Sequence, residues 1–416
     1  MKFNIPAIGQ FTFLLILNIS NALFQLAVIP LLIHNTDNSL VGAYFLALSF
    51  GVLACIFINF GTGQTAVIEV RQAIENKLAY NQIAANIISL RFWALLLALL
   101  VCSVLPFIVK NGWLYLCVIP LLFSELINPQ YFLIATYNVK QYSVLNTLMR
   151  ILIFIGIYIF RANDHIVAIA LTMSGFGVLL LHLKYINQAF FIRNIFSLWP
   201  SFSKIKNLIK AQALVLGNGL TVHLQQSLFL FALPNFVSPI FLSAYGLIDK
   251  LVSSGRMLVN AYSAAVMPHA AGTYQQGMEN WERLKKQQNK ILTLLCLLAA
   301  AVLYFFPDQI LSILLWGKKA VNPDFFNQAT ILLKLIAPVP LLIALNVLNV
   351  TELILEKEYL AYFIAGLLVL LVAFLFVAFM YLGLPIQVAG YYPIFIEGSC
   401  LLIYFLILKG LRNAKN

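Results

Sequence analysis

Twelve long apolar runs limit the fold of this sequence more than any other feature. They lie near residues 11–33, 41–60, 83–108, 113–134, 143–160, 165–187, 210–233, 238–268, 291–315, 328–355, 359–382 and 386–408. A transmembrane helix needs about 20 consecutive, mostly apolar residues, and each run reaches roughly that length. Only helices and closed barrels satisfy every backbone hydrogen bond inside a bilayer. The runs therefore predict twelve transmembrane helices in an all-α polytopic membrane protein.

The composition excludes a soluble protein. Of the 416 residues, 62% are hydrophobic and 10% are charged, whereas a soluble domain carries about 25% charged residues. The first run continues to Ile33, which is too long for a signal peptide and indicates a retained span. The five cysteines lie in apolar runs without a CxxC pair, and no Gly-rich phosphate-binding spacing is present. We expect no cofactor, no metal site and no enzyme activity.

The distribution of Lys and Arg predicts the orientation. The termini and the connections after every second predicted helix together hold 17 of the 26 basic residues, and the opposite connections hold 4. Basic residues gather on the cytoplasmic side of membrane proteins. We therefore expect both termini in the cytoplasm, with the chain in the inner membrane of a bacterium. The net charge of +12 indicates this bias and an anionic ligand, with no nucleic acid as partner.

A short repeat predicts two equivalent halves. The segment GAYFLALSF (42–50) matches SAYGLIDKL (243–251) at three positions, and each copy opens the second helix of a set of six. Six helices per half give a parallel repeat. We expect an N-terminal six-helix bundle at 1–187 and a C-terminal six-helix bundle at 210–416. The segment WPSFSKIKNLIKAQ (199–212) begins in the connection 188–209. We expect this connection to be a cytoplasmic, interfacial amphipathic linker.

Several charged residues fall inside the predicted spans. Arg91 is followed by 18 apolar residues, which cross ~27 Å as a helix, so we expect Arg91 at the membrane interface. Lys334 fits the outer interface for the same reason. For Arg150, Glu125 and Glu397, the apolar residues on one side alone are too few to cross the membrane. We therefore expect these three residues inside their spans. Buried charges are costly in hydrocarbon and are retained for function.

The span at 238–268 carries a polar stripe. On a helical wheel, its polar members fall within an arc of about 80°, and these are Tyr245, Asp249, Ser253, Arg256, Asn260 and Ser263. Lys250 lies just outside the arc. Asp249 and Arg256 are two turns apart, ~10 Å, so each needs another partner. Gln225 belongs to a second polar cluster on the preceding span. The stripe suits a water-filled cavity. The alternative is a buried ladder of ion pairs that only holds helices together.

The sequence resembles the bacterial O-antigen repeat-unit flippases over nearly its whole length. The similar segments are INFGTGQTAVIEVRQA, ELINPQYFLIATYNVKQYSVLNTLMR, SAYGLIDKLVSSGRMLVNAYSAAVMPHAA, LLKLIAPVPLLIALNVLNVTELIL and IEGSCLL. In the last of these, Glu397 matches a Glu often present in the final helix of that family. Two departures are His269, where the family commonly has Arg or Lys, and Tyr131, where it often has Trp.

This resemblance implies the multidrug/oligosaccharidyl-lipid/polysaccharide exporter fold, with two six-helix bundles forming a V around a central cavity. The implied function, within lipopolysaccharide biosynthesis, is translocation of an undecaprenyl-diphosphate-linked oligosaccharide from the cytoplasmic to the periplasmic leaflet, by antiport with H⁺ or Na⁺. Membrane lipids and the polysaccharide polymerase machinery are the other implied partners. We expect the substrate-binding residues to be Arg150, Lys250, Arg256, Asn260, Ser253, Tyr245, Gln225 and Lys334. We expect Asp249, Glu125 and Glu397 to couple transport to the ion gradient.

Three other functions compete with this hypothesis. A drug/cation antiporter of the same superfamily would favour a net acidic lumen, and the buried set here is mixed. A peptidoglycan-precursor flippase typically has fourteen spans, against twelve here. A membrane polysaccharide polymerase or ligase usually carries a large periplasmic loop, and the longest outer connection here, about 316–327, is short.

Overall fold

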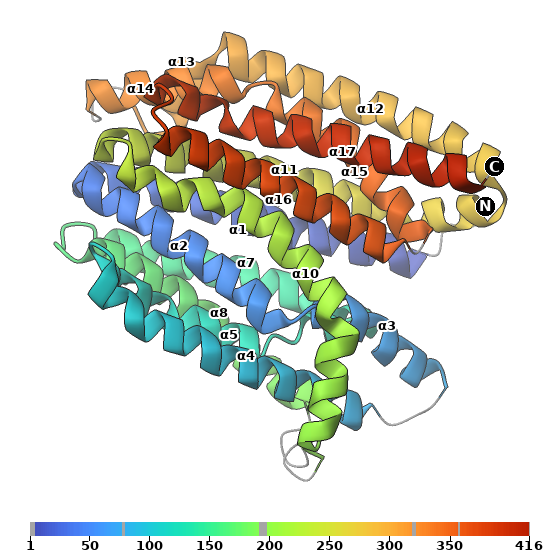
Figure 1. Cartoon of the computed structure of the whole chain (residues 1–416). Helices are drawn as coiled ribbons and strands as arrows, with labels where there is room; N and C mark the ends of the chain where they lie inside the picture. The colour runs from blue at the N-terminus through green and yellow to red at the C-terminus, as the bar shows by residue number, and fades with distance from the viewer. Residues whose placement is uncertain (1–4, 77–79, 191–197, 318–321, 357, 416) are drawn as a thin grey trace. The chain divides into compact units, whose positions relative to one another are not determined.

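The computed structural model describes residues 5–76, 80–190, 198–317, 322–356 and 358–415. Every regular element in these ranges is a helix. Ten helical segments of the described chain are long and apolar enough to cross a membrane. The other two predicted spans correspond to α10 (Phe202–Ala232) and α11 (Pro239–Gln275), which are long but more polar. The prediction of an all-α polytopic membrane protein is thus confirmed (Figure 1).

The chain divides into two compact units. Unit 1 comprises residues 1–24 and 35–220, and unit 2 comprises residues 25–34 and 221–416. Two helices therefore contribute to both units. Helix α1 (Ile5–Asn35) changes unit after Phe24 and returns to unit 1 at its last residue, and α10 changes unit after Leu220. Residues 191–197 of the expected linker lie outside the described residues, and Phe202–Lys210 are continuous with the rest of α10.

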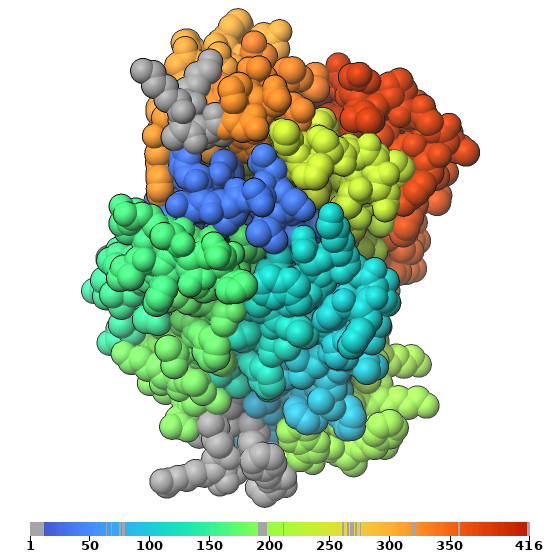
Figure 2. All heavy atoms as spheres, turned by 90° about the vertical axis from the view of Figure 1, so that its left-hand side faces the viewer, coloured from blue at the N-terminus to red at the C-terminus, as the bar shows by residue number. Residues whose placement is uncertain are grey.

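Unit 1 is built mainly from the helices between α1 and α10. In chain order these are α2 (Asn38–Asn59), α3 (Thr62–Glu75), α4 (Asn81–Ile108), η1 (Gly112–Val118), α5 (Ile119–Leu126), α6 (Gln130–Ala135), α7 (Val139–Ile159) and α8 (Ile166–Phe190). Helix α8 packs on α5 and α7, and α2 packs on α4 and α5. Figure 2 shows the cyan to green part of the chain, which includes much of this unit, as one continuous packed surface.

Unit 1 has two helix breaks, one directly after the candidate span Asn38–Asn59 and one inside the candidate span Gly112–Ala135. The break between α2 and α3 has two consecutive left-handed residues, Phe60 (φ 53°) and Gly61 (φ 75°). The break between α5 and α6 contains Pro129, which has no backbone N–H to donate to a preceding carbonyl. Both breaks leave backbone polar groups that need new partners.

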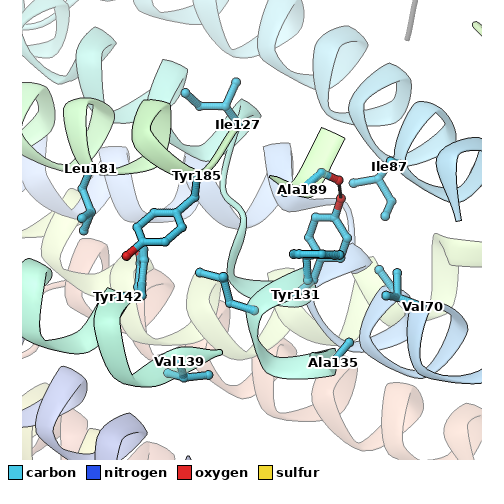
Figure 3. Packing of buried hydrophobic residues seen from close by; sticks show 14 of the residues in the cluster. Val70, Ile87, Ile127, Tyr131, Ala135, Val139, Tyr142, Leu181, Tyr185 and Ala189 are labelled. Carbon is cyan, nitrogen blue, oxygen red and sulfur yellow. Dashed lines mark hydrogen bonds between the residues drawn. The ribbon is translucent and has the colours of Figure 1, made fainter. Parts of the chain in front are cut away.

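A buried cluster packs several helices of unit 1 near these breaks. Figure 3 shows Tyr131, Tyr142, Tyr185 and their aliphatic neighbours from α6, α7 and α8. The hydroxyl of Tyr131 donates to the carbonyl of Ala189 at 3.0 Å. The aromatic rings therefore fill the space next to α6, and the Tyr131 hydroxyl is satisfied by the end of α8.

Unit 2 contains the remaining helices. They are η2 (Leu233–Asn235), α11, α12 (Met278–Phe305), α13 (Pro307–Leu314), α14 (Pro323–Ile336), α15 (Val339–Leu355), α16 (Tyr359–Tyr381), η4 (Ile386–Tyr391) and α17 (Tyr392–Lys415). Helix α11 begins at a Ser-Pro pair, where the hydroxyl of Ser238 accepts from the N–H of Phe241 at 3.3 Å. Helix α15 packs on α11, α12 and α17, so it lies at the centre of this unit.

Candidate functional site

The clearest charge pair of the predicted site joins two helices of unit 2. Arg256 lies in the middle of α11 and Glu397 lies near the start of α17. The Nε and Nη2 groups of Arg256 both donate to Oε1 of Glu397, at 3.0 and 2.5 Å. Their side chains are only 14% and 9% exposed. Arg256 thus finds its counter-charge on another helix, as its position two turns from Asp249 required.

The other two charges of the stripe pair with each other on the same helix. Nζ of Lys250 lies 3.3 Å from Oδ2 of Asp249, although we expected Asp249 to find a partner on another helix or in water. Tyr245 is buried and Ser253 is half-buried one turn to either side of Asp249. The side chain of Asn260 lies outside the described residues. The stripe therefore holds two separate ion pairs.

A narrow cavity lies along this stripe within unit 2. It has a volume of about 20 Å³, enough for about one water molecule. Its polar lining comes from Gln226, Tyr245, Asp249, Arg256 and Tyr392. Within unit 2, the stripe therefore borders a small space of this size.

Gln225 faces away from this cavity, toward α17. Its Nε2 lies 3.7 Å from Sγ of Cys400, and its backbone carbonyl accepts from the hydroxyl of Tyr392. The ring of Tyr392 stacks on Phe229, with centroids 4.2 Å apart. Gln226, which the sequence analysis did not select, lines the cavity instead. A helical wheel of α10 alone could not show which of the two glutamines lines the cavity, because the wheel does not say which neighbouring helix packs on each side.

Arg150 lies in unit 1 in a neutral environment. Its Nε donates to Oδ1 of Asn21 at 2.9 Å, and its guanidinium lies 4.8 Å from the ring centre of Phe24. Asn146 donates to the same oxygen of Asn21 at 3.1 Å. Within the described part of the chain, Arg150 contacts no carboxylate. Arg150 is thus a cation without a direct counter-charge there.

Glu125 lies at the broken helix of unit 1 and is enclosed by amides. Its carboxylate accepts from Nδ2 of Asn59 at 2.6 Å and from Nδ2 of Asn128 at 3.0 Å. Asn59 is the last residue of α2, so this contact joins one helix break to the other. The carboxylate is therefore held by neutral donors and makes no direct ion pair among the described residues.

Arg91 connects the same two breaks, and its expected interfacial position is wrong. Its side chain is 1% exposed. Its Nε donates to the hydroxyl of Thr62 at 3.0 Å, and its Nη1 donates to the backbone carbonyls of Asn128 and Glu125 at 2.8 and 3.3 Å. These carbonyls are the ones that the break before α6 frees. Arg91 therefore replaces missing helical hydrogen bonds instead of facing lipid headgroups.

A second ion-pair cluster of unit 2 was missed by the sequence analysis. Glu352 on α15 is fully buried and accepts from Nζ of Lys285 at 2.7 Å and from the indole of Trp281 at 3.1 Å. Arg412 of α17 donates to its other oxygen from Nε at 3.1 Å and Nη2 at 2.6 Å. The sequence signal was only a glutamate at the end of a span beside basic connections, which does not identify the partners.

The predicted site residues therefore form several groups. Tyr245, Asp249, Lys250, Arg256 and Glu397 lie close together in unit 2. Arg150 and Glu125 belong to unit 1, in two different hydrogen-bond networks. Lys334 is exposed near the end of α14 and belongs to none of these groups. In the described ranges, no group of three or more metal-ligating side chains is present, and all five cysteines are free thiols.

Comparison with known proteins shows what this fold resembles. No family model and no curated protein matches the sequence. Among solved structures, the chain is similar to an inward-facing multidrug resistance MATE family transporter of the MOP superfamily, with a TM-score of 0.65, 13% identity, and coverage of 99% of this chain and 98% of that one. The MATE transporter VcmN of Vibrio cholerae gives a TM-score of 0.64, 14% identity, and coverage of 99% and 98%.

A third neighbour is a MOP superfamily transporter from Pyrococcus furiosus, described as having a binding pocket of reverse polarity that suggests a different function. It gives a TM-score of 0.62, 15% identity, and coverage of 98% of this chain and 95% of that one. The chain thus has the fold of MOP superfamily transporters along almost its entire length. These neighbours agree with the fold that the sequence resemblance implies, but they do not single out the O-antigen flippases.

Proposed function

We propose that this chain is a multi-pass secondary transporter that moves an amphipathic substrate across a membrane without covalent chemistry. The observation that carries this proposal is the agreement with transporter structures over 98–99% of the chain. Transporters built from repeated bundles work by alternating access, in which the substrate site opens to one side and then to the other. The proposed location is the bacterial inner membrane, with both termini in the cytoplasm.

The first substrate hypothesis is a drug or organic cation, exchanged for H⁺ or Na⁺. The descriptions of the solved neighbours favour this hypothesis over the O-antigen flippase. Two of the neighbours are named as MATE transporters, and one of these two is described as a multidrug resistance transporter. A cation-binding transporter needs a carboxylate that can become available to the substrate. Glu125 meets this requirement best, since its present donors are the amides of Asn59 and Asn128.

The second substrate hypothesis is the undecaprenyl-diphosphate-linked oligosaccharide of the O-antigen repeat unit. The observation that favours it is the charge balance of the membrane-embedded side chains. Asp249, Glu352 and Glu397 each contact a cation, whereas Arg150 contacts no carboxylate in the described ranges. Arginine binds phosphate oxygens through several N–H groups at once. In this hypothesis the cations that meet the diphosphate are Arg150 in unit 1 and Lys250 and Arg256 in unit 2, and the polar side chains of the stripe with Gln225 bind sugar hydroxyls.

Purified protein in proteoliposomes distinguishes the two hypotheses. One arm measures uptake of a fluorescent organic cation driven by an H⁺ or Na⁺ gradient. The other measures translocation of a fluorescent polyprenyl diphosphate sugar between leaflets. If folded protein moves neither substrate under any gradient, the proposed transport function is contradicted.

Arg150 provides the matched variants for this experiment. If the substrate carries a diphosphate, Arg150→Gln should reduce translocation by about tenfold or more, which corresponds to the loss of one charge-assisted contact. Arg150→Lys keeps the charge and should retain part of the activity. Normal translocation of the diphosphate sugar by Arg150→Gln at normal protein levels would contradict the role of Arg150.

A further inference from the structure

The pair between Arg256 and Glu397 uses only part of each side chain. A guanidinium has five N–H donors, and the two that Arg256 engages both go to Oε1 of Glu397. Among the described residues, the hydrogen bonds of this pair run from Nε and Nη2 of Arg256 to Oε1 of Glu397, and none involves Nη1 or Oε2. The strongest arginine–carboxylate pairs engage both carboxylate oxygens in parallel. This pair therefore leaves donors of Arg256 available for a second anion.

Arg256 also borders the cavity of unit 2. The cavity is lined by Arg256 but not by Glu397. Gln226 and Tyr245 line it as well, and their amide and hydroxyl can donate to anionic oxygens. A ligand that reached this cavity would therefore meet the guanidinium together with these two neutral donors.

Asp249 lines the same cavity but is engaged differently. Its carboxylate pairs with Lys250 on its own helix at 3.3 Å, and its position is ~10 Å from Arg256 along α11. Asp249 therefore contributes to the local field without occupying the guanidinium. Of these two acids, Glu397 alone is in direct contact with Arg256.

Taking the carboxylate away from a buried arginine–carboxylate pair leaves the cation uncompensated and is strongly destabilising. A transporter that offers Arg256 to an anionic substrate must therefore supply another counter-charge whenever it is empty. We propose that Glu397 is this internal counter-ion: a phosphate-type anion takes its place on Arg256 when the substrate binds, and the ion pair re-forms after release. This inference rests on the transport function proposed above and assigns an anionic phosphate ester to its substrate.

Binding to the purified protein in lipid nanodiscs tests the exchange. The probes are farnesyl diphosphate and inorganic pyrophosphate, measured by calorimetry, so that a lipid-linked and a free phosphate source are distinguished. Glu397→Gln should tighten binding of the preferred probe at least tenfold, because the carboxylate no longer competes for the guanidinium. Glu397→Asp, which withdraws the carboxylate by one methylene, should tighten it less.

Two controls separate exchange from a general change of charge. Asp249→Asn removes a negative charge from the same cavity without releasing the guanidinium, so it should tighten binding by a smaller factor than Glu397→Gln. In the Arg256→Gln background, the gain produced by Glu397→Gln should disappear. Equal gains in Asp249→Asn and Glu397→Gln would overturn the exchange, since the effect would then be general electrostatics.

The ratio of net translocation to substrate exchange is a second measurement. A purely structural role of Glu397 would not change this ratio. Net translocation requires the empty protein to return, whereas exchange of labelled for unlabelled substrate does not. Glu397→Gln should lower net translocation of a fluorescent polyprenyl diphosphate at least tenfold while exchange stays within threefold of the wild type. Equal loss of net translocation and exchange would overturn the counter-ion role.

The outcomes also separate this inference from the proposed function. If diphosphate binding depends on Arg256 but Glu397→Gln leaves it unchanged or weakens it, the counter-ion inference fails and transport stands. If the protein transports organic cations and binds neither diphosphate probe, the anionic substrate class and the counter-ion inference both fail, while transport again stands.

Discussion

Replacing Glu352 by Gln should destabilise unit 2 severely. Gln has nearly the same volume as Glu, so the packing of α15 is preserved. The substitution removes the negative charge that accepts from Lys285, Trp281 and Arg412, all within 3.1 Å. It also places an amide NH₂ group against at least one of these donors. The two cations would then face a neutral side chain in a buried location.

The magnitude follows from the burial of the partners. Removing one member of a buried ion pair costs about 3–5 kcal/mol, because the remaining charge is left uncompensated. Glu352 is fully buried, but Arg412 is 36% exposed and also contacts Glu282. Water and Glu282 therefore screen part of the charge that is left. We expect the free energy of unfolding to fall by about 3 kcal/mol, the lower end of that range.

Equilibrium unfolding in mixed micelles, followed by tryptophan fluorescence, measures this change. The matched control is Glu279→Gln in α12, the helix that carries Lys285; its carboxylate is 91% exposed and lies 3.7 Å from Arg283. An exposed pair of this kind contributes little to stability, so the control should unfold like the wild type. A loss below about 1 kcal/mol in Glu352→Gln would refute the argument from buried charge.

Two further predictions concern unit 1 and use the same unfolding assay, each with a control variant. A Cβ on Gly175 would lie 2.6 Å from the backbone nitrogen of Leu121. Gly175→Ala should therefore cost about 1–3 kcal/mol by forcing α8 away from α5. The control Gly255→Ala has nothing within 4 Å of its new Cβ and should instead stabilise its helix by about 0.5–1 kcal/mol. A smaller effect in the first variant than in the second would contradict this account of the packing. Arg91→Met takes the donor from the carbonyl of Asn128 and one of two donors from the carbonyl of Glu125, so it should cost about 2–3 kcal/mol. Arg161→Met, at an exposed position, should have no measurable effect.

The number and type of the main elements could be predicted from the sequence because a bilayer permits so few structures. Runs of about 20 apolar residues become helices, since no other structure satisfies their backbone. The break between α5 and α6 lies at Pro129, a residue type that kinks or ends helices. The break at Phe60 and Gly61 was not predicted, because Phe60 takes a left-handed conformation that its residue type does not favour.

The partners of the buried charges were harder to predict than their presence. Arg91 was placed at the interface by counting the apolar residues after it, a criterion that considers one helix at a time. Its actual role depends on carbonyls freed more than 30 positions later in the chain. Glu352 likewise meets Lys285 and Arg412 from helices 67 and 60 positions away. Such pairings depend on tertiary packing, which periodicity and composition do not encode.

The division of α1 and α10 between the two units has a consequence for dissecting the protein. A cut in the connection before Phe202 would leave the N-terminal fragment without the complete unit 1, because Phe202–Leu220 would be on the other piece. The C-terminal fragment would in turn lack Gln25–His34, where His34 contacts the carbonyl of Leu315 at 2.7 Å. Each fragment holds a segment that the other needs. Co-expressed halves should therefore accumulate only together, and neither half can serve alone as a model of one bundle.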